Sequence, residues 1–153
     1  MNSNDLNDFP QIDVTEIRGK ITFGLYQINQ GLGYLAERFD TNGNYEIRIN
    51  KNVELDKDGT HLLLSSFQSR HCNRKHYGVY IKYKSYLNDV EAIVAWICTC
   101  LSGKRTCGCC SHVAGLIYYL SYGKHQEDSI KVPGKFLNKL LISHRLSDDE
   151  LDI

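Results

Sequence analysis

The sequence predicts an α+β fold in which a series of antiparallel strands lies between two helical segments. Apolar residues recur at helical spacing after residue 17, and short runs of alternating apolar and polar residues follow between residues 45 and 98. A second helical segment comes directly after a cysteine-rich turn. Because 42% of the 153 residues are hydrophobic, the chain can enclose one core, and we expect a single domain over residues 17–125.

The N-terminal part predicts a flexible acidic leader over residues 1–16, followed by a helix within residues 17–39. Glycines at three positions weaken this helix, because each costs about 1 kcal/mol relative to alanine. The turn residues Asn42 and Gly43 should end it. Five apolar residues form its expected buried face: Leu25, Ile28, Leu32, Leu35 and Phe39.

Four strands are expected next. The first includes Tyr45, Ile47 and Ile49, and a turn at residues 57–59 separates it from the second, over residues 61–70. Residues 77–83 form the third strand. Residues 90–98, which are rich in Val and Ile and contain Trp96, form the fourth strand and place the tryptophan in the core.

The second helix is expected over residues 111–122, with Ser111 as its N-cap and Gly123 as its C-terminal stop. Residues 126–153 predict a weak helix at 135–143 and an acidic tail that is mobile. The α+β prediction thus ends with strand, cysteine-rich turn and helix in direct succession.

The cysteine-rich turn predicts a metal site. Cys98 and Cys100 stand two residues apart at the end of a strand, so both sulfurs can face one ion. Cys110 and His112 stand at the start of a helix, where the backbone N–H groups favour a thiolate. Three thiolates and an imidazole match the preference of Zn²⁺ for four tetrahedral ligands. We therefore predict that Cys98, Cys100, Cys110 and His112 share one Zn²⁺ ion.

Two alternatives to this ligand set stay open. Cys107 or Cys109 could replace one of the ligands, because both lie in the same short segment. The cysteines could also be thiols without a metal, although so many free thiols would be exposed to oxidation. Our interpretation is that Cys107 and Cys109 do not bind the ion and that Cys72 is a free thiol.

The pattern of CxC, a nine-residue spacer and CxH resembles the SWIM zinc finger. The stretches SRHCNRKHYGVYIKY (residues 69–83) and AWICTCLSGKRTCGCCSHVAGLIYYLSYGK (residues 95–124) are similar to SWIM proteins encoded by animal transposable elements. The likeness covers roughly residues 17–124. It implies a ββα zinc module over residues 79–122 that binds DNA or protein, in the context of mutator-like transposases.

No enzyme and no small-molecule substrate are expected. Four protein ligands close a structural zinc site, whereas a catalytic site keeps one position open for water. Between residues 59 and 126 the acids are Asp89 and Glu91, at a strand entry, where we expect solvated side chains. The three clustered acids with which mutator-like transposases cut DNA have no counterpart in the chain.

The charge distribution favours a nucleic-acid partner. Residues 59–126 carry eight Lys or Arg and two acids, a net charge of +6, although the whole chain is neutral. We expect this block to bind phosphates, and DNA is the implied partner. Tyrosines at 77, 80, 83 and 86 could stack on bases or pack in the core. The expected phosphate-binding residues are Arg70, Arg74, Lys75, Lys82, Lys84, Lys104 and Arg105.

The alternative function is a protein-binding adaptor. Tyr118, Tyr119 and Tyr122 do not share one face of the second helix, so an exposed tyrosine there would suit a protein interface. The chain contains no run of apolar residues long enough for a membrane span and no N-terminal secretion signal. We expect an intracellular protein without membrane contact and, from the resemblance, a nuclear one.

Overall fold

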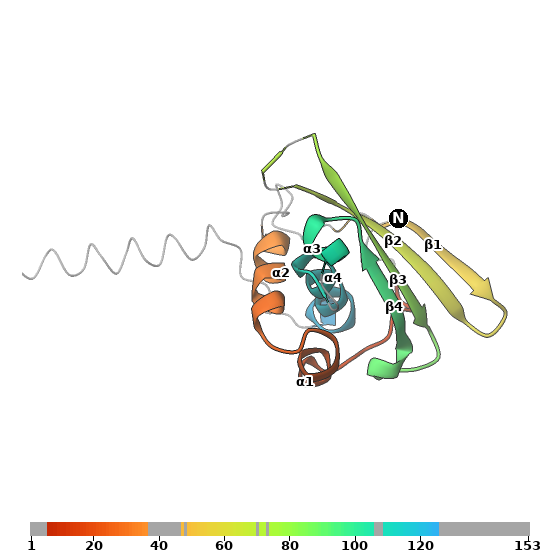
Figure 1. The fold of residues 1–153 in the computed structure, drawn as a ribbon. Helices are drawn as coiled ribbons and strands as arrows, with labels where there is room; N and C mark the ends of the chain where they lie inside the picture. Colours follow the sequence, from red (N-terminus) through yellow and green to blue (C-terminus); the bar gives the residue numbers. More distant parts are fainter. Residues whose placement is uncertain are drawn as a thin grey trace, which may run out of the picture.

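In the described part of the chain, four antiparallel strands form a sheet in which neighbours along the chain are also neighbours in space, in the order β1-β2-β3-β4 (Figure 1). The strands are β1 (Ile49–Asp56), β2 (Thr60–Gln68), β3 (His76–Lys84) and β4 (Ile93–Cys98). The computed structural model describes residues 6–36, 47, 49–69, 71–72, 74–105 and 109–125. The α+β fold with an antiparallel sheet, predicted from the sequence, is confirmed.

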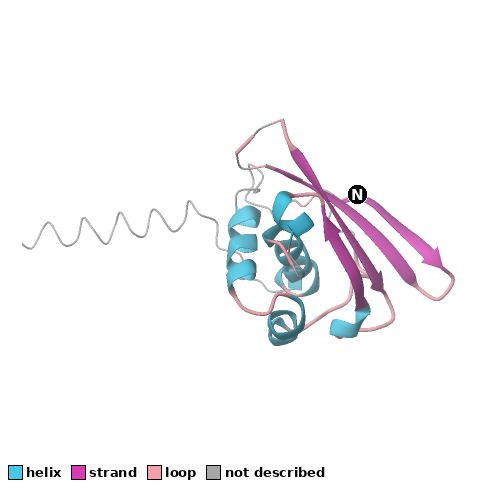
Figure 2. Cartoon of the chain, viewed as in Figure 1, coloured by secondary structure: helices cyan, strands magenta, loops and turns pink. Residues whose placement is uncertain are grey.

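The two faces of the sheet differ because side chains alternate along each strand. In β3, Val79, Ile81 and Tyr83 are buried, whereas Tyr80 and Lys82 lie on the opposite face. The helices cover the face that carries the buried side chains, which we call the inner face, and we call the opposite one the outer face (Figure 2). The core therefore lies between the inner face and the helices.

Helices α2 (Tyr26–Ala36) and α4 (Ser111–Ser121) pack against each other beside the sheet. Their backbones meet where Gly31 faces Gly115. A Cβ atom added to Gly31 would lie 2.6 Å from the Gly115 nitrogen and 2.8 Å from the carbonyl oxygen of Ser111. A side chain at Gly31 would therefore collide with backbone atoms, and a Cβ atom at Gly115 would lie 3.1 Å from the Cα atom of Gly31, closer than an ordinary contact.

The helix expected over residues 17–39 is divided. It begins with α1 (Val14–Glu16) and a π-helical turn, η2 (Ile17–Ile21), and resumes only at α2. Phe23 and Gly24 interrupt it with φ angles of +52° and +148°. These angles are incompatible with a right-handed helix. Of the expected buried face, Ile28 and Leu35 are buried, whereas Leu25, which follows the interruption directly, is exposed.

The flexible leader expected over residues 1–16 is wrong for residues 6–16. Leu6, Phe9 and Ile12 are buried in the core, and the ring of Phe9 lies 4.7 Å from that of Tyr83. The ammonium group of Lys124 donates a hydrogen bond to the carbonyl oxygen of Leu6. The sequence prediction missed this packing because the segment is acidic in composition. Its three apolar side chains nevertheless anchor it in the core.

Several element boundaries differ from expectation. A 3-10 turn, η3 (Val90–Ala92), precedes β4, with the Asp89 carboxylate accepting a hydrogen bond from the Glu91 N–H. A short helix, α3 (Leu101–Arg105), occupies the spacer that the sequence predicted as a turn. The N-cap of α4 is Cys110 rather than Ser111, and α4 is followed by η4 (Gly123–His125).

Some predictions fall outside the described residues. They are the turn at Asn42 and Gly43, the strand position of Tyr45, and the helix and tail within residues 126–153. Among the helices that the structure describes, none combines the length and the apolar character needed to cross a membrane.

Candidate metal centre

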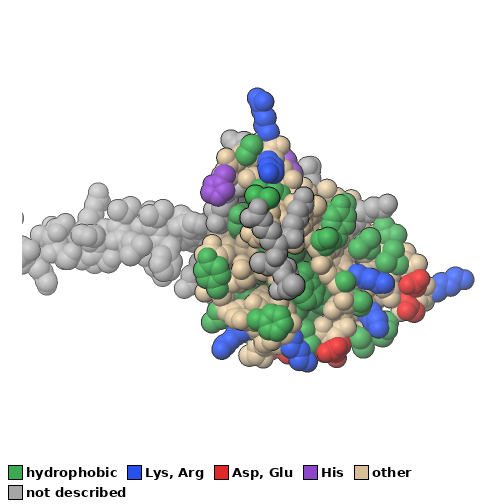
Figure 3. All heavy atoms as spheres, in the orientation of Figure 1, with side chains coloured by type: hydrophobic (Ala, Val, Ile, Leu, Met, Phe, Trp, Pro, Cys, Tyr) green, Lys and Arg blue, Asp and Glu red, His purple; other side chains and the backbone are tan. Residues whose placement is uncertain are grey.

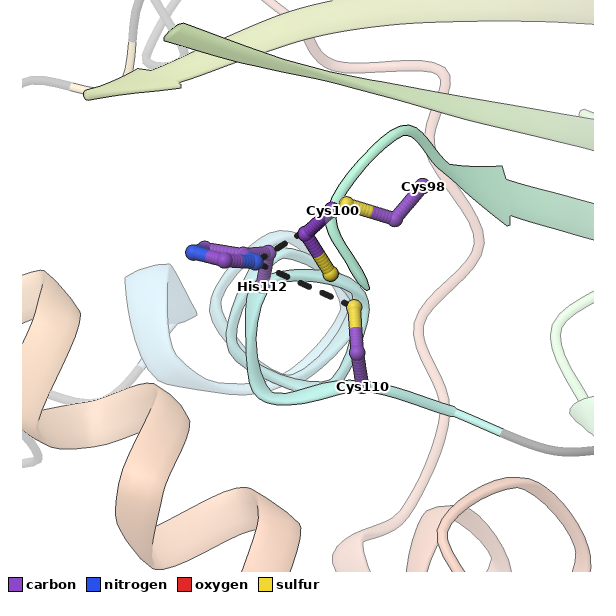
Figure 4. Close-up of side chains that lie close together, drawn as sticks. All are labelled: Cys98, Cys100, Cys110 and His112. Carbon is purple, nitrogen blue, oxygen red and sulfur yellow. Dashed lines mark hydrogen bonds between the residues drawn. The ribbon is translucent and has the colours of Figure 1, made fainter. Parts of the chain in front are cut away.

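The end of β4 and the start of α4 bring four metal-binding side chains together. Cys98 is the last residue of β4, and Cys100 follows it in a bend. Cys110 caps α4, and His112 lies in its first turn. All four side chains point toward one another from these two elements (Figure 4).

The ligand atoms of these residues lie within 4.8 Å of one another, and all four residues are buried. The Nδ1 atom of His112 is 3.8 Å from the Cys98 sulfur and 3.9 Å from the Cys110 sulfur (Figure 4). A tetrahedral ion with bonds of about 2.0–2.3 Å holds its ligand atoms roughly 3.5–3.8 Å apart. Small side-chain movements would therefore close the site around a metal ion, which this cluster could hold.

The three thiols of the cluster differ in the direction in which their pKa values are shifted. A hydrogen bond from the Cys98 thiol lowers the pKa of Cys110 to about 4, and the same bond, together with burial, raises the pKa of Cys98. Burial also raises the pKa of Cys100. Since only thiolates bind metals, a cation that enters the cluster would displace the protons of Cys98 and Cys100.

Three aromatic rings fix the orientation of His112. Its ring centroid lies 4.5 Å from that of Tyr34 in α2, 5.6 Å from Phe67 in β2 and 5.2 Å from Tyr77 in β3. The Nε2 atom is buried among these elements and has no hydrogen-bond partner among the residues that the structure describes. Packing thus holds Nδ1 toward the three sulfurs. No sequence spacing pointed to Tyr34 or Phe67, which lie far from the cysteines along the chain.

Two further contacts hold the first cysteine pair in place. Thr99, between the two cysteines, binds Gly78 of β3 twice: its hydroxyl accepts from the Gly78 N–H at 2.9 Å, and its N–H donates to the Gly78 carbonyl at 3.0 Å. In α3, the Gly103 N–H lies 3.1 Å from the Cys100 sulfur and donates to it. Cys100 therefore reaches the cluster through a bend that α3 supports, not along a straight strand as expected.

The other cysteines differ in their surroundings. Cys109 is buried outside the four-residue cluster, and its thiol donates to the carbonyl oxygen of Cys110 at 3.4 Å. Burial raises the pKa of the Cys109 thiol. Cys72 is exposed and free, which agrees with the sequence prediction. Cys107 lies outside the described residues.

The expected phosphate-binding residues lie in three places. Arg74 and Lys75 are exposed in the β2–β3 loop, whereas Lys82 and Lys84 lie toward the other end of β3. At about 3.4 Å per residue, Lys75 and Lys82 are more than 20 Å apart. Figure 3 shows Lys and Arg side chains over the β2–β3 loop and, separately, at the far end of the sheet. Lys104 and Arg105 end α3, and Arg70 lies outside the described residues.

The tyrosines do not support an exposed interface on α4. Tyr118 and Tyr119 are buried, and Tyr122 is partly buried against the core. Among the strand tyrosines, Tyr83 is buried and Tyr80 is partly exposed. Tyr118 and Tyr119 therefore offer no exposed ring to a partner, and the adaptor function stays a prediction. Trp96, expected in the core, packs against it while partly exposed.

A cavity of about 200 Å³ lies beside the cluster, with Cys100, Cys110 and His112 in its wall. Hydroxyl-bearing residues and His71 form much of the remaining wall, and none of the described lining residues carries a carboxylate. A water molecule near the cluster would thus find no carboxylate base within this wall.

Comparisons with protein-family models, curated proteins and solved structures found no significant match.

Proposed function

We propose that the protein binds one structural Zn²⁺ ion through Cys98, Cys100, Cys110 and His112, and that the folded domain binds nucleic acid. The observation that carries the first part is the convergence of three thiols and one imidazole nitrogen in a buried cluster. Thiolate ligands select soft or borderline metals, and a tetrahedral S₃N set is typical of zinc.

A structural role follows from the number and burial of the ligands. Four protein ligands leave no open coordination position for a substrate. Among the described residues that line the cavity beside the cluster, none carries a carboxylate that could serve as a base. The ion would instead join the end of β4 to the start of α4, with eleven residues between Cys98 and Cys110. Its binding free energy would add directly to the stability of this half of the domain.

The order β3, β4, ligand turn and α4 is compatible with a ββα module of the SWIM type. The resemblance to SWIM proteins extends this proposal to DNA binding, a transposon origin and a nuclear location. Physical support for a nucleic-acid partner comes from the cations outside the core. Arg74 and Lys75 are exposed, and Lys82 stands on the outer face of the sheet.

Metal content tests the first part. Elemental analysis of protein purified without chelator should find one zinc per wild-type chain. The double variant Cys110→Ser/His112→Ala should contain none. The matched control Cys72→Ser/His125→Ala removes one cysteine and one histidine that lie outside the cluster and should keep the metal. A folded wild-type protein without metal would refute the zinc proposal.

Salt dependence tests the second part. Binding to a labelled DNA should weaken linearly with the logarithm of salt concentration. Replacing Arg74 and Lys75 by Gln should reduce the slope by about 0.7–0.9 for each phosphate that the variant no longer neutralises. An affinity that does not respond to salt or to these substitutions would exclude phosphate binding by the β2–β3 loop.

A further inference from the structure

The outer face of the sheet carries an aromatic side chain in an unusual position. The ring of Tyr80 leans over Gly78: a Cβ atom at Gly78 would lie 3.2 Å from Cε2 of Tyr80 and 3.5 Å from its hydroxyl oxygen. The ring therefore lies along the strand instead of standing upright, and 36% of the residue is exposed. The exposed part of the ring lies on the outer face, where a ligand could contact it.

Apolar neighbours extend this surface across three strands. Tyr80 pairs with Leu64 of β2 on one side and with Ile97 of β4 on the other. Directly paired residues project on the same face of a sheet, so these three side chains form one row. Ile97 is 60% exposed, and Leu64 is partly buried. We call Leu64, Tyr80 and Ile97 the outer row.

Positive charge lies beside the outer row. Lys82 follows Tyr80 by two residues on the same face, at a distance of about 7 Å along the strand. Within the described part of the chain, no ion pair holds its ammonium group. Lys84 lies farther along, where its charge interacts with Asp58. At the opposite end, Lys75 and Arg74 are exposed in the loop before β3.

Helices α2 and α4 and the β1–β2 hairpin are poorly suited to enter a groove of duplex DNA. Direct readout in the major groove uses an exposed helix or a two-stranded ribbon. In α4 every residue from His112 to Ser121 is buried, and α2 contains no charged residue. The β1–β2 hairpin ends in Asp56, Lys57 and Asp58, a net negative tip that phosphates would repel.

We infer that the outer face binds single-stranded nucleic acid, with a base stacked on Tyr80 and the phosphates beside Lys82. This inference rests on the proposed nucleic-acid function and names the class of ligand. Single-strand binding combines aromatic faces for the bases with a line of cations for the backbone, and the outer face offers both. Leu64 and Ile97 would contact the flanking sugars and bases, while Lys75 and Arg74 would hold the strand where it leaves the sheet.

The test compares strands with a duplex, using the full chain as purified with its metal. Fluorescence anisotropy would measure binding of a labelled DNA of about 20 nucleotides, alone or annealed to its complement, in about 50 mM salt. The single strand should bind more tightly. Tyr80→Ala should raise its Kd by roughly 10- to 100-fold, and Tyr80→Phe, which keeps the aromatic face, should not.

One variant serves as a control, and a second tests the positive charge beside the outer row. Tyr26→Ala removes a tyrosine that is 71% exposed on α2, away from the sheet, and should leave the affinity unchanged. Lys82→Gln should lower the salt slope by about 0.7, the value for one phosphate of a single strand. Metal content and near-ultraviolet circular dichroism would verify the fold of each variant.

The outcomes separate this inference from the function on which it rests. Duplex binding that is as tight as single-strand binding, or an unchanged affinity in Tyr80→Ala, overturns the outer-face inference and leaves nucleic-acid binding intact. No binding of either form overturns both. The metal content of the same samples decides the zinc proposal independently.

Discussion

Replacing Gly31 by alanine should destabilise the protein, although alanine is the better helix former. The new Cβ atom would lie 2.6 Å from the backbone nitrogen and 2.7 Å from the Cα atom of Gly115. The two helices must separate by about 0.8 Å to restore an ordinary contact, and overpacking of this kind costs about 1–3 kcal/mol. Helix propensity offsets up to about 1 kcal/mol of this cost. Because rigid backbone atoms must move, we expect a net loss of about 1–2 kcal/mol.

The matched control is Gly19→Ala in the turn η2, where a Cβ atom would have nothing within 4 Å. It should leave the free energy of unfolding unchanged or raise it by up to about 1 kcal/mol. Urea denaturation of zinc-saturated protein measures both variants, and the Gly31→Ala midpoint should fall by roughly 0.5–1 M. If Gly31→Ala proves as stable as the wild type, the close contact between α2 and α4 does not exist.

Three other predictions address the site and the core. Gly103→Ala should weaken metal binding by about tenfold or more in competition with a chromophoric chelator, since its Cβ would lie 2.7 Å from the carbonyl oxygen of Cys98 and would push α3 from the cluster. Leu6→Ala should lower the free energy of unfolding by about 2–4 kcal/mol in urea, because Leu6 is buried, whereas Leu25→Ala at an exposed position should change it by less than about 1 kcal/mol. Cys72→Ser should abolish the fastest phase of thiol modification by a disulfide reagent in the native protein, and an unchanged fast phase would show that another thiol is accessible.

Local patterns predicted the parts of the fold that local forces determine. The alternation in residues 77–83 predicted β3 because one face of that strand is buried, and the apolar run after Ser111 predicted α4. The four-residue cluster could be predicted for the same reason. Two short spacings, from Cys98 to Cys100 and from Cys110 to His112, carry the chemistry.

The remaining features depend on contacts between distant segments. Gly31 lowers the helix propensity of its segment, yet it allows α2 to approach α4. The apolar side chains of Leu6 and Phe9 have no periodic pattern, so their burial depends on a core that other segments build. Tyr34 and Phe67, which orient His112, reach it only through the tertiary fold. Spacing within one segment cannot reveal such partners.

The hydrogen bond from Lys124 to Leu6 joins residues that are 118 positions apart. During synthesis, the first apolar residues leave the ribosome long before α4 exists to cover them. The sheet can form while translation continues, because its strands pair in chain order. Closure of the core, and with it the capture of Cys110 and His112 by the first cysteine pair, must wait until the chain has been made beyond residue 124. The domain should therefore fold as a unit only near the end of its own translation, and nascent chains that stall earlier should remain sensitive to proteases.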